Sequence, residues 1–310
     1  MNMRRGLFLS LLICFCTSAS FADALDLNTA LQNTYKACVD IDDNLHDLKV
    51  LAGVNTAVTA VGTGLGVGAT VTGFVKASKD NQAQEVAKKI NYNERPVNVF
   101  PTNEEMDAFE AAFNSEEMRR LYDELREDSK KLGDWRTGLL AGNTVTNVAG
   151  AVIASRTINK DDIQGQVDAC VSATKDLNNA IIAAKMNGED INEAKQIYDA
   201  CREYEFVDLK PINKRGTGAM ISSAIGAGLG GAGTVVSGVA NSEAIRQDNK
   251  DISEKTDSDW KKEKDLNTAA NALSVGATAA SATAVVFNAT QIAAVKKVAK
   301  VSESCTGVLK

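Results

Sequence analysis

The sequence predicts an all-α protein built from two antiparallel helical hairpins, elongated or bundle-like in shape. Three features of the chain predict this fold. Four long stretches carry no charged residue, a charged segment separates the members of each pair, and apolar residues in the flanking segments recur at steps of three and four. Such steps place side chains on one face of an α-helix. Aromatic residues make up only 5% of the chain, so we expect a core of Ala, Val, Leu and Gly.

Residues 1–22 have the pattern of a signal peptide. Two arginines, Arg4 and Arg5, precede an apolar stretch, residues 6–16, that is too short for a membrane span. Small residues then favour cleavage after Ala22 or after Ala24; an uncleaved anchor is the alternative. We therefore expect an exported protein, periplasmic or secreted. Removal of residues 1–22 takes two positive charges from a chain of net charge -6, which leaves an acidic mature protein.

The four charge-free runs define the two hairpins. The chain twice repeats the order run, charged tip, run, and sequence similarity supports an internal repeat, because Tyr35-Lys36-Ala37-Cys38 resembles Tyr198-Asp199-Ala200-Cys201. The runs are residues 50–75, 137–155, 216–242 and 266–295. Hairpin 1 covers residues 23–187 with a tip at 76–136, and hairpin 2 covers residues 188–310 with a tip at 243–265.

The segments outside the runs are expected to be amphipathic helices. Apolar residues keep helical spacing over residues 27–48, 163–184 and 191–201, and Asn187-Gly188 is a typical helix stop. Within the first tip we expect two further helices, one over residues 102–113 and one over residues 118–135 with near-heptad spacing.

The runs themselves are predicted to be helical despite unfavourable composition. Gly and Thr lower helix propensity and Val favours strands, so a β structure for the runs is an open alternative. Helix is favoured because small residues recur at helical steps, which lets two helices approach closely along a glycine seam. The helix-seam glycines are Gly62, Gly66, Gly73, Gly226, Gly230 and Gly233.

Four cysteines remain after removal of the signal peptide, and export permits disulfides. Each lies roughly equally far along the chain from the middle of its nearest run, so antiparallel arms bring Cys38 level with Cys170, and Cys201 level with Cys305. The spacing therefore predicts the disulfides Cys38–Cys170 and Cys201–Cys305, each closing the base of one hairpin. Free or crossed thiols are the alternative.

Membrane insertion of the runs is a second open question. All four are long enough to span a bilayer, which needs about 20 apolar residues. Gly, Thr, Ser and residues such as Asn55 and Asn241 oppose insertion of any single run. Two interpretations follow. The runs form the dry interior of a soluble bundle, or they insert together as a Gly-zipper assembly.

The composition argues against several chemistries. An acidic chain with a pI near 5.1 lacks the basic face that nucleic acid requires. The pattern Gly226-x-Gly228-x-x-Gly231 lies inside a Gly/Ala run, outside the strand and helix context of a dinucleotide site. The acidic residues around His46 lack the spacing of a calcium loop and read best as a solvated helix face. We expect no cofactor, no bound metal and no enzymatic activity.

One surface is a candidate for protein recognition, either of a partner or of a second copy. It comprises large side chains of the first tip, namely Met106, Phe109, Phe113 and Trp135. The sequence thus favours a non-enzymatic exported helical scaffold or interaction protein of a cell envelope. The alternative is a membrane-associated or pore-forming Gly-zipper protein whose four runs insert together.

Overall fold

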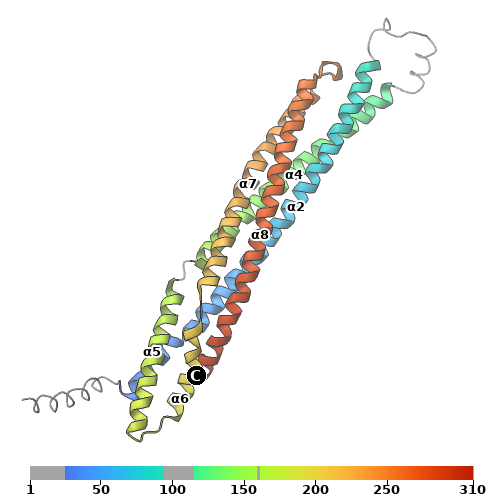
Figure 1. Cartoon of the computed structure of the whole chain (residues 1–310). Coiled ribbons are helices and arrows are strands. Elements are labelled where there is room, and N and C mark those ends of the chain that lie inside the picture. Colours follow the sequence, from blue (N-terminus) through green and yellow to red (C-terminus); the bar gives the residue numbers. More distant parts are fainter. Residues whose placement is uncertain (1–24, 94–114, 159–160, 310) are drawn as a thin grey trace, which may run out of the picture. The chain divides into compact units, whose positions relative to one another are not determined.

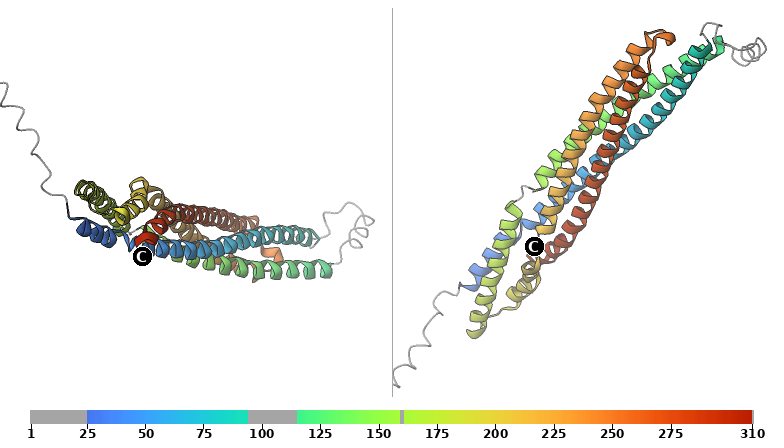
Figure 2. Two further views of the ribbon diagram at one scale, coloured as in Figure 1. Left: turned by 90° about the horizontal axis from the view of Figure 1, so that it is seen from below. Right: turned by 45° about the horizontal axis from the view of Figure 1, so that its top comes forward.

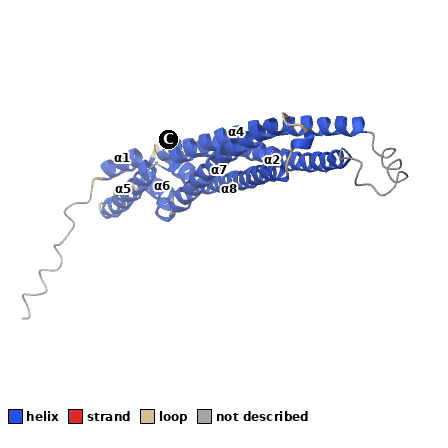
Figure 3. Cartoon of the chain, turned by 90° about the horizontal axis from the view of Figure 1, so that it is seen from above, coloured by secondary structure: helices blue, strands red, loops and turns tan. Residues whose placement is uncertain are grey.

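The computed structural model describes residues 25–93, 115–158 and 161–309, and these residues form helices and loops without a strand (Figure 3). The protein is therefore all-α over its described length. All four charge-free runs are helical, which excludes the β alternative for them. The predicted helix at residues 102–113 lies outside the described residues.

The chain divides into two compact units. Unit 1 comprises the described parts of Met1–Lys49, Lys160–Lys210 and Ala293–Lys310, and unit 2 comprises those of Val50–Asn159 and Pro211–Ile292. Each unit takes segments from both predicted hairpins.

Unit 2 is a bundle of four long helices (Figures 1 and 2). They are the unit 2 portions of α2 (Ile41–Asn93), α4 (Ser115–Ile158), α7 (Lys210–Asp248) and α8 (Asp257–Leu309). α2 and α4 are antiparallel, as are α7 and α8. α2 also contacts α8, where the hydroxyls of Thr70 and Ser274 are 2.8 Å apart, and α4 contacts α7, where those of Thr137 and Ser237 are 2.8 Å apart.

The buried positions of these helices follow a strict repeat of three- and four-residue steps. In α2 the buried residues of the first run are Ala52, Asn55, Thr59, Gly62, Gly66, Ala69 and Gly73. This spacing is that of coiled coils, in which a narrow stripe of each helix faces its partners. The same spacing continues through Lys76, Asp80 and Ala83 beyond the run.

Unit 1 has the apolar core of an ordinary globular domain. It contains α1 (Leu27–Cys38), α5 (Asp161–Met186), α6 (Asn192–Cys201), the 3₁₀ helix η2 (Arg202–Phe206) and the adjoining ends of α2 and α8. α5 ends as predicted near Gly188, which has a φ of 77° that glycine adopts without strain. The large core residues are Ile41, Leu45, Leu48, Ile163, Val167, Leu177, Ile197, Tyr204, Val295 and Val298.

Both predicted disulfides are present in unit 1. Cys38 pairs with Cys170 and Cys201 pairs with Cys305, and all four residues are fully buried. The sulfur atoms of Cys38, Cys201 and Cys305 lie within 4.8 Å of one another, so the two bridges are neighbours. They close loops of 132 and 104 residues, for which chain entropy predicts a stabilisation of about 4–5 kcal/mol each.

The tip of unit 2 has a small apolar core of its own. Its buried members are Ala83, Val86, Ala87, Ile90, Tyr122, Leu125 and Trp260. The 3₁₀ helix η3 (Ile252–Glu254) lies between α7 and α8, and Asp259 caps α8 by accepting hydrogen bonds from Thr256 N and Oγ1.

Candidate functional site

The interior of unit 2 changes from apolar to polar where the charge-free runs begin. In the unit 2 portions of the runs, the only buried apolar side chain larger than Ala is Leu140. The remaining buried positions are small or carry an amide or hydroxyl. The buried polar residues of the runs are Asn55, Thr59, Asn143, Asn147, Ser222, Ser223, Ser237, Asn241, Asn267, Asn271, Ser274, Ser281, Asn288 and Gln291.

The outer surface of the same runs is apolar. Val145 is 67% exposed and Val235 is 66% exposed. The other exposed large apolar residues of the runs are Val50, Val54, Val61, Val67, Val71, Phe74, Val75, Val148, Val152, Ile221, Ile225, Val239, Val275 and Val286. These residues come from all four helices, so each helix of unit 2 carries exposed apolar side chains along its run.

We call this combination of a polar interior and an apolar exterior inverted polarity, and it is confined to the runs. Unit 1 buries Leu, Ile and Val, and the tip buries Tyr122, Leu125 and Trp260. The buried stripe keeps its three- and four-residue spacing through the runs and into the tip, so the helix geometry stays the same while the chemistry of the buried residues changes. The packing mode is therefore the same along the bundle, and only the chemistry of the buried positions changes.

The seam glycines receive amide and hydroxyl side chains from neighbouring helices. A Cβ atom on Gly62 would lie 2.6 Å from Thr146 Oγ1, and one on Gly226 would lie 2.9 Å from Asn147 Oδ1. Gly66 faces Asn143 in the same way, and Gly73 faces Asn271. Each of these four glycines thus makes room for a polar group, whereas the seam glycine Gly233 faces Leu140 and Leu273.

The polar side chains are hydrogen-bonded across the bundle in successive layers. Asn55 Nδ2 donates to Asn288 Oδ1 at 2.9 Å, and Asn147 Nδ2 donates to Ser281 Oγ at 2.8 Å. Nearer the tip, Thr70 and Ser274 share a hydroxyl contact of 2.8 Å. Polar groups that are buried away from water need such hydrogen-bond partners. The layers therefore allow the bundle to hold polar side chains inside an apolar exterior.

Arg136 ends this series of neutral layers on the tip side. Its guanidinium is fully buried and donates to Ser237 Oγ at 2.9 Å, Asn271 Oδ1 at 3.0 Å and Asn267 Oδ1 at 3.1 Å. All three acceptors are uncharged. Burial lowers the pKa of Arg136 to about 10, so its positive charge persists at neutral pH.

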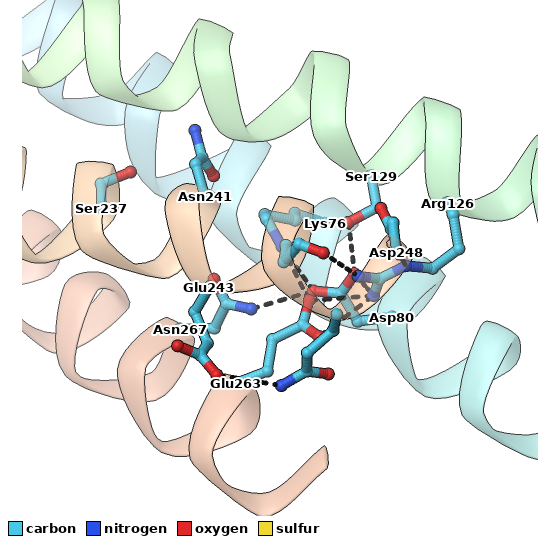
Figure 4. Close-up of polar contacts among 12 residues, drawn as sticks. Lys76, Asp80, Arg126, Ser129, Ser237, Asn241, Glu243, Asp248, Glu263 and Asn267 are labelled. Atoms are coloured by element: carbon cyan, nitrogen blue, oxygen red, sulfur yellow. Dashed lines mark hydrogen bonds and ion pairs between the residues drawn. The ribbon is translucent and has the colours of Figure 1, made fainter. Parts of the chain in front are cut away.

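A cluster of buried ion pairs lies beyond Arg136 (Figure 4). Lys76 Nζ lies 2.6 Å from Asp80 Oδ2, and Arg126 Nη1 lies 2.9 Å from Glu263 Oε1. Arg126 Nε also donates to Asp248 Oδ1 at 2.7 Å. The cluster therefore joins α2, α4, α7 and α8 at one level.

Asn267 links Arg136 to this cluster. Its Oδ1 accepts from Arg136 Nη2, and its Nδ2 donates to Asp80 Oδ2 at 2.9 Å. Ser129 Oγ also donates to Asp80. The polar axis is thus continuous from the neutral layers into the ion pairs.

The environment of the cluster shifts its proton affinities. Burial raises the pKa of Glu263, and Arg126 beside it works in the opposite direction. Burial lowers the pKa of Lys255, whose ammonium lies 4.9 Å from the ring centre of Tyr122 and 5.5 Å from that of Trp260. Burial raises the pKa of Tyr122. These are the shifts of a tightly packed charge cluster rather than of a solvated surface.

Several buried polar atoms of the runs have no hydrogen-bond partner among the residues that the structure describes. They are Asn55 Oδ1, Asn143 Nδ2, Ser223 Oγ, Asn241 Oδ1 and Gln291 Oε1. Leaving one such atom unpaired costs about 1–3 kcal/mol. They are distributed along the length of the bundle, so the axis as a whole has unused hydrogen-bonding capacity.

Two of these atoms converge on one point. A Cβ atom on Gly150 would lie 3.2 Å from Ser223 Oγ and 3.3 Å from Asn55 Oδ1. The methyl carbon of Thr59 would lie 2.8 Å from the same atom, so Gly150 lets these side chains pack closely against its helix.

The sequence-predicted residues fall into three groups. The four cysteines pair as predicted in unit 1, and the six helix-seam glycines all lie on buried faces of unit 2. Of the candidate recognition surface, Met106, Phe109 and Phe113 lie outside the described residues. Trp135 is 68% exposed and lies two residues before the start of the second run.

The axial amides and the ion-pair cluster were not predicted as a site. Sequence reasoning treated Asn55 and Asn241 only as obstacles to insertion, whereas the structure buries both. The helical spacing could have predicted that Asn55 is buried, because it lies on the same three- and four-residue repeat as Gly62, Gly66 and Gly73 on α2.

Four helices of the described chain are long and apolar enough to cross a membrane by length and composition, and each contains one of the charge-free runs. Comparisons with family models, with curated proteins and with solved structures find no match for the chain, which leaves its geometry as the guide to its function.

Proposed function

We propose that the four charge-free runs form a membrane-embedded helical bundle of an exported, non-enzymatic envelope protein. The inverted polarity of unit 2 carries this proposal. In water, a bundle gains stability by burying Val and Ile and exposing amides. In lipid the exterior contacts acyl chains and polar side chains associate inside, which is the arrangement of the runs.

The dimensions of the runs support the same proposal. The shortest run, residues 137–155, is about 28 Å long at ~1.5 Å per residue, close to the ~30 Å thickness of a hydrocarbon core. Charged side chains flank the runs and none lies within them. Phe74 and Trp135 are exposed at the tip ends of the first two runs, where membrane proteins place aromatic residues at the interface with water.

The disulfides give the bundle an orientation. Disulfides persist in oxidising compartments, and the predicted signal peptide directs the N-terminus out of the cytoplasm. Each run has one end toward a tip and one end away from it. At the end away from the tip, the chain continues into unit 1, which holds both disulfides. Unit 1 is therefore assigned to the extracytoplasmic side, and residues 76–136 and 243–265 to the other side.

Fractionation of the envelope tests the proposal. The cleaved, oxidised protein should stay with membranes through an alkaline carbonate wash and enter solution only with detergent. Release of the folded protein by osmotic shock or carbonate would contradict membrane embedding. That result would favour the soluble envelope scaffold, for which the core of unit 1 would be the main source of stability.

Protease protection tests the orientation. In sealed spheroplasts, protease added outside should cleave exposed sites of unit 1, such as the Asn187-Gly188 turn, and should spare residues 243–265. The opposite pattern of cleavage would reverse the assignment of the two sides.

A further inference from the structure

The axis of unit 2 has the composition of a path for ions rather than of a structural core alone. Buried hydroxyl and amide groups occur at successive levels of the runs, and five of their polar atoms lack partners in the described part of the chain. Buried atoms of this kind take water as a partner where the site is polar and has room. Two of these atoms, Ser223 Oγ and Asn55 Oδ1, lie within 3.3 Å of one point beside Gly150, next to the methyl group of Thr59.

Arg136 determines which ions such a path would favour. Its buried guanidinium has only neutral hydrogen-bond acceptors, Ser237, Asn271 and Asn267. A fixed positive charge on a narrow polar path repels cations and attracts anions. The four runs contain no carboxylate. Asp80, outside the runs, is linked to Arg136 through Asn267 and partly offsets its charge.

The tip side offers an approach to Arg136 from solvent. An open cavity of about 80 Å³ between α2 and α8 is lined in part by Asn267, whose Oδ1 accepts from Arg136. Lys264 and the ion-paired Asp80 and Glu263 also line this cavity. Both carboxylates of the lining are paired with buried cations, Asp80 with Lys76 and Glu263 with Arg126.

Leu140 interrupts the polar path. It is fully buried and lies one turn from Arg136 on α4. In the unit 2 runs it is the only buried side chain that is both apolar and larger than Ala. Its side chain lies 3.4 Å from where a Cβ atom of Gly233 would stand on α7. Bulky apolar groups on a polar path close it by excluding water.

We propose that the axis of the bundle is a closed, hydrated path for small inorganic anions such as chloride, with Leu140 as its constriction and Arg136 as its selectivity-determining residue. This inference rests on the proposed membrane embedding of unit 2. It adds to that proposal a transported class of ion and the two residues that control it.

The test uses the full-length oxidised protein in sealed lipid vesicles loaded with a chloride-quenched dye. Leu140→Ala should raise chloride influx at least tenfold above the wild-type rate, because it removes the constriction. Val145→Ala is the matched control, since Val145 lies on the same helix and faces outward. It should leave the chloride influx at the wild-type rate.

Selectivity is measured in the Leu140→Ala background. Vesicles loaded with a potassium-sensitive dye should show no potassium influx. Adding Arg136→Gln should abolish the preference for chloride over potassium, whereas Arg136→Lys, which keeps the charge, should retain it. Potassium influx through the Leu140→Ala protein with Arg136 intact would overturn the proposal.

Two failures are distinguishable. If the Leu140→Ala protein resists carbonate extraction from the vesicles yet passes chloride no faster than Val145→Ala, the ion path is wrong and membrane embedding stands. If carbonate removes the wild-type protein from vesicles, the embedding is wrong and the ion path falls with it.

Discussion

The side-chain oxygen of Asn271 lies where a Cβ atom on Gly73 would stand, and Asn271 Nδ2 donates to the carbonyl oxygen of Gly73 at 3.3 Å. The same side-chain oxygen accepts a hydrogen bond from Arg136. A glycine on one helix thereby positions an amide of a second helix for the guanidinium of a third.

Gly73→Ala should destabilise unit 2 by about 1–3 kcal/mol, because the added methyl displaces Asn271. Gly66→Leu and Gly230→Leu should cost at least as much, since both glycines face side chains of neighbouring helices. The control is Gly64→Ala, since a Cβ atom there would meet nothing within 4 Å, and it should gain up to about 1 kcal/mol of helix propensity. Thermal unfolding in detergent measures the difference. Equal midpoints for the Gly73→Ala and Gly64→Ala proteins would contradict close packing at Gly73.

Val145→Lys should impair membrane insertion. Val145 lies at the middle of the second run and faces outward, where a lysine costs about 2.5–3.5 kcal/mol in a bilayer. Leu121→Lys is the control, because Leu121 is exposed on the same helix but lies in the tip. Carbonate extraction of both variants gives the readout. In a soluble bundle both lysines would be tolerated alike, so equal extraction of the two proteins would count against embedding.

Arg126→Met should destabilise the tip by about 3–5 kcal/mol, since it leaves Glu263 buried without its closest cation. Adding Glu263→Gln should recover part of the loss, because the buried charge is then removed as well. Lys131→Met is the control, since Lys131 pairs with Glu127 at the exposed surface. Denaturant unfolding of the single and double variants provides a double-mutant cycle. Additive effects of the two substitutions would mean that Arg126 and Glu263 are not coupled.

Acid should loosen the start of α8. Hydrogen bonds from Lys250 and from the backbone and hydroxyl of Thr256 lower the pKa of Asp259 from 3.8 to about 2. A depressed carboxyl pKa contributes stability that is present above the unfolded value and is lost as the pH falls from about 4 through about 2. Hydrogen exchange of residues 256–263 should therefore accelerate over this window in the wild-type protein. Asp259→Asn should exchange faster at neutral pH and show a weaker dependence on pH.

Peptide mapping without reduction should recover Cys38 joined to Cys170 and Cys201 joined to Cys305. Replacing Cys201 and Cys305 together by Ser should lower the stability of unit 1 by about 4–5 kcal/mol on the chain-entropy model. Recovery of a peptide joining Cys38 to Cys201 would overturn the pairing, and the closeness of their sulfur atoms makes this the relevant alternative.

Much of the fold follows from the sequence because its determinants are local. Apolar periodicity predicts α5 and α6, the Asn187-Gly188 pair predicts the turn between them, and equal spacing from the runs predicts both disulfides. Periodicity did not reveal the interruption between α1 and α2, after Cys38, because the apolar stripe continues across it from Cys38 to Ile41.

The candidate site was harder to predict because its meaning depends on which way each residue faces. Asn55 in an apolar run reads as an obstacle to insertion when only composition is counted. Once the phase of the helix is known, Asn55 lies inside and Val54 outside, and the same residues indicate a polar axis in an apolar exterior. The pairing of Arg126 with Glu263 joins residues 137 positions apart, for which no local pattern exists.

The unbroken heptad register of α2 has a consequence for protein engineering. Its buried positions keep one spacing from Ala52 to Ile90, although they change from Gly and Asn to Val and Ile on the way. The register of the helix is therefore independent of whether its buried positions are apolar or polar. Replacing the axial amides by Leu and Ala of matched volume, and the outward valines by Glu and Lys, should yield a water-soluble bundle with the same helix order and the same disulfides.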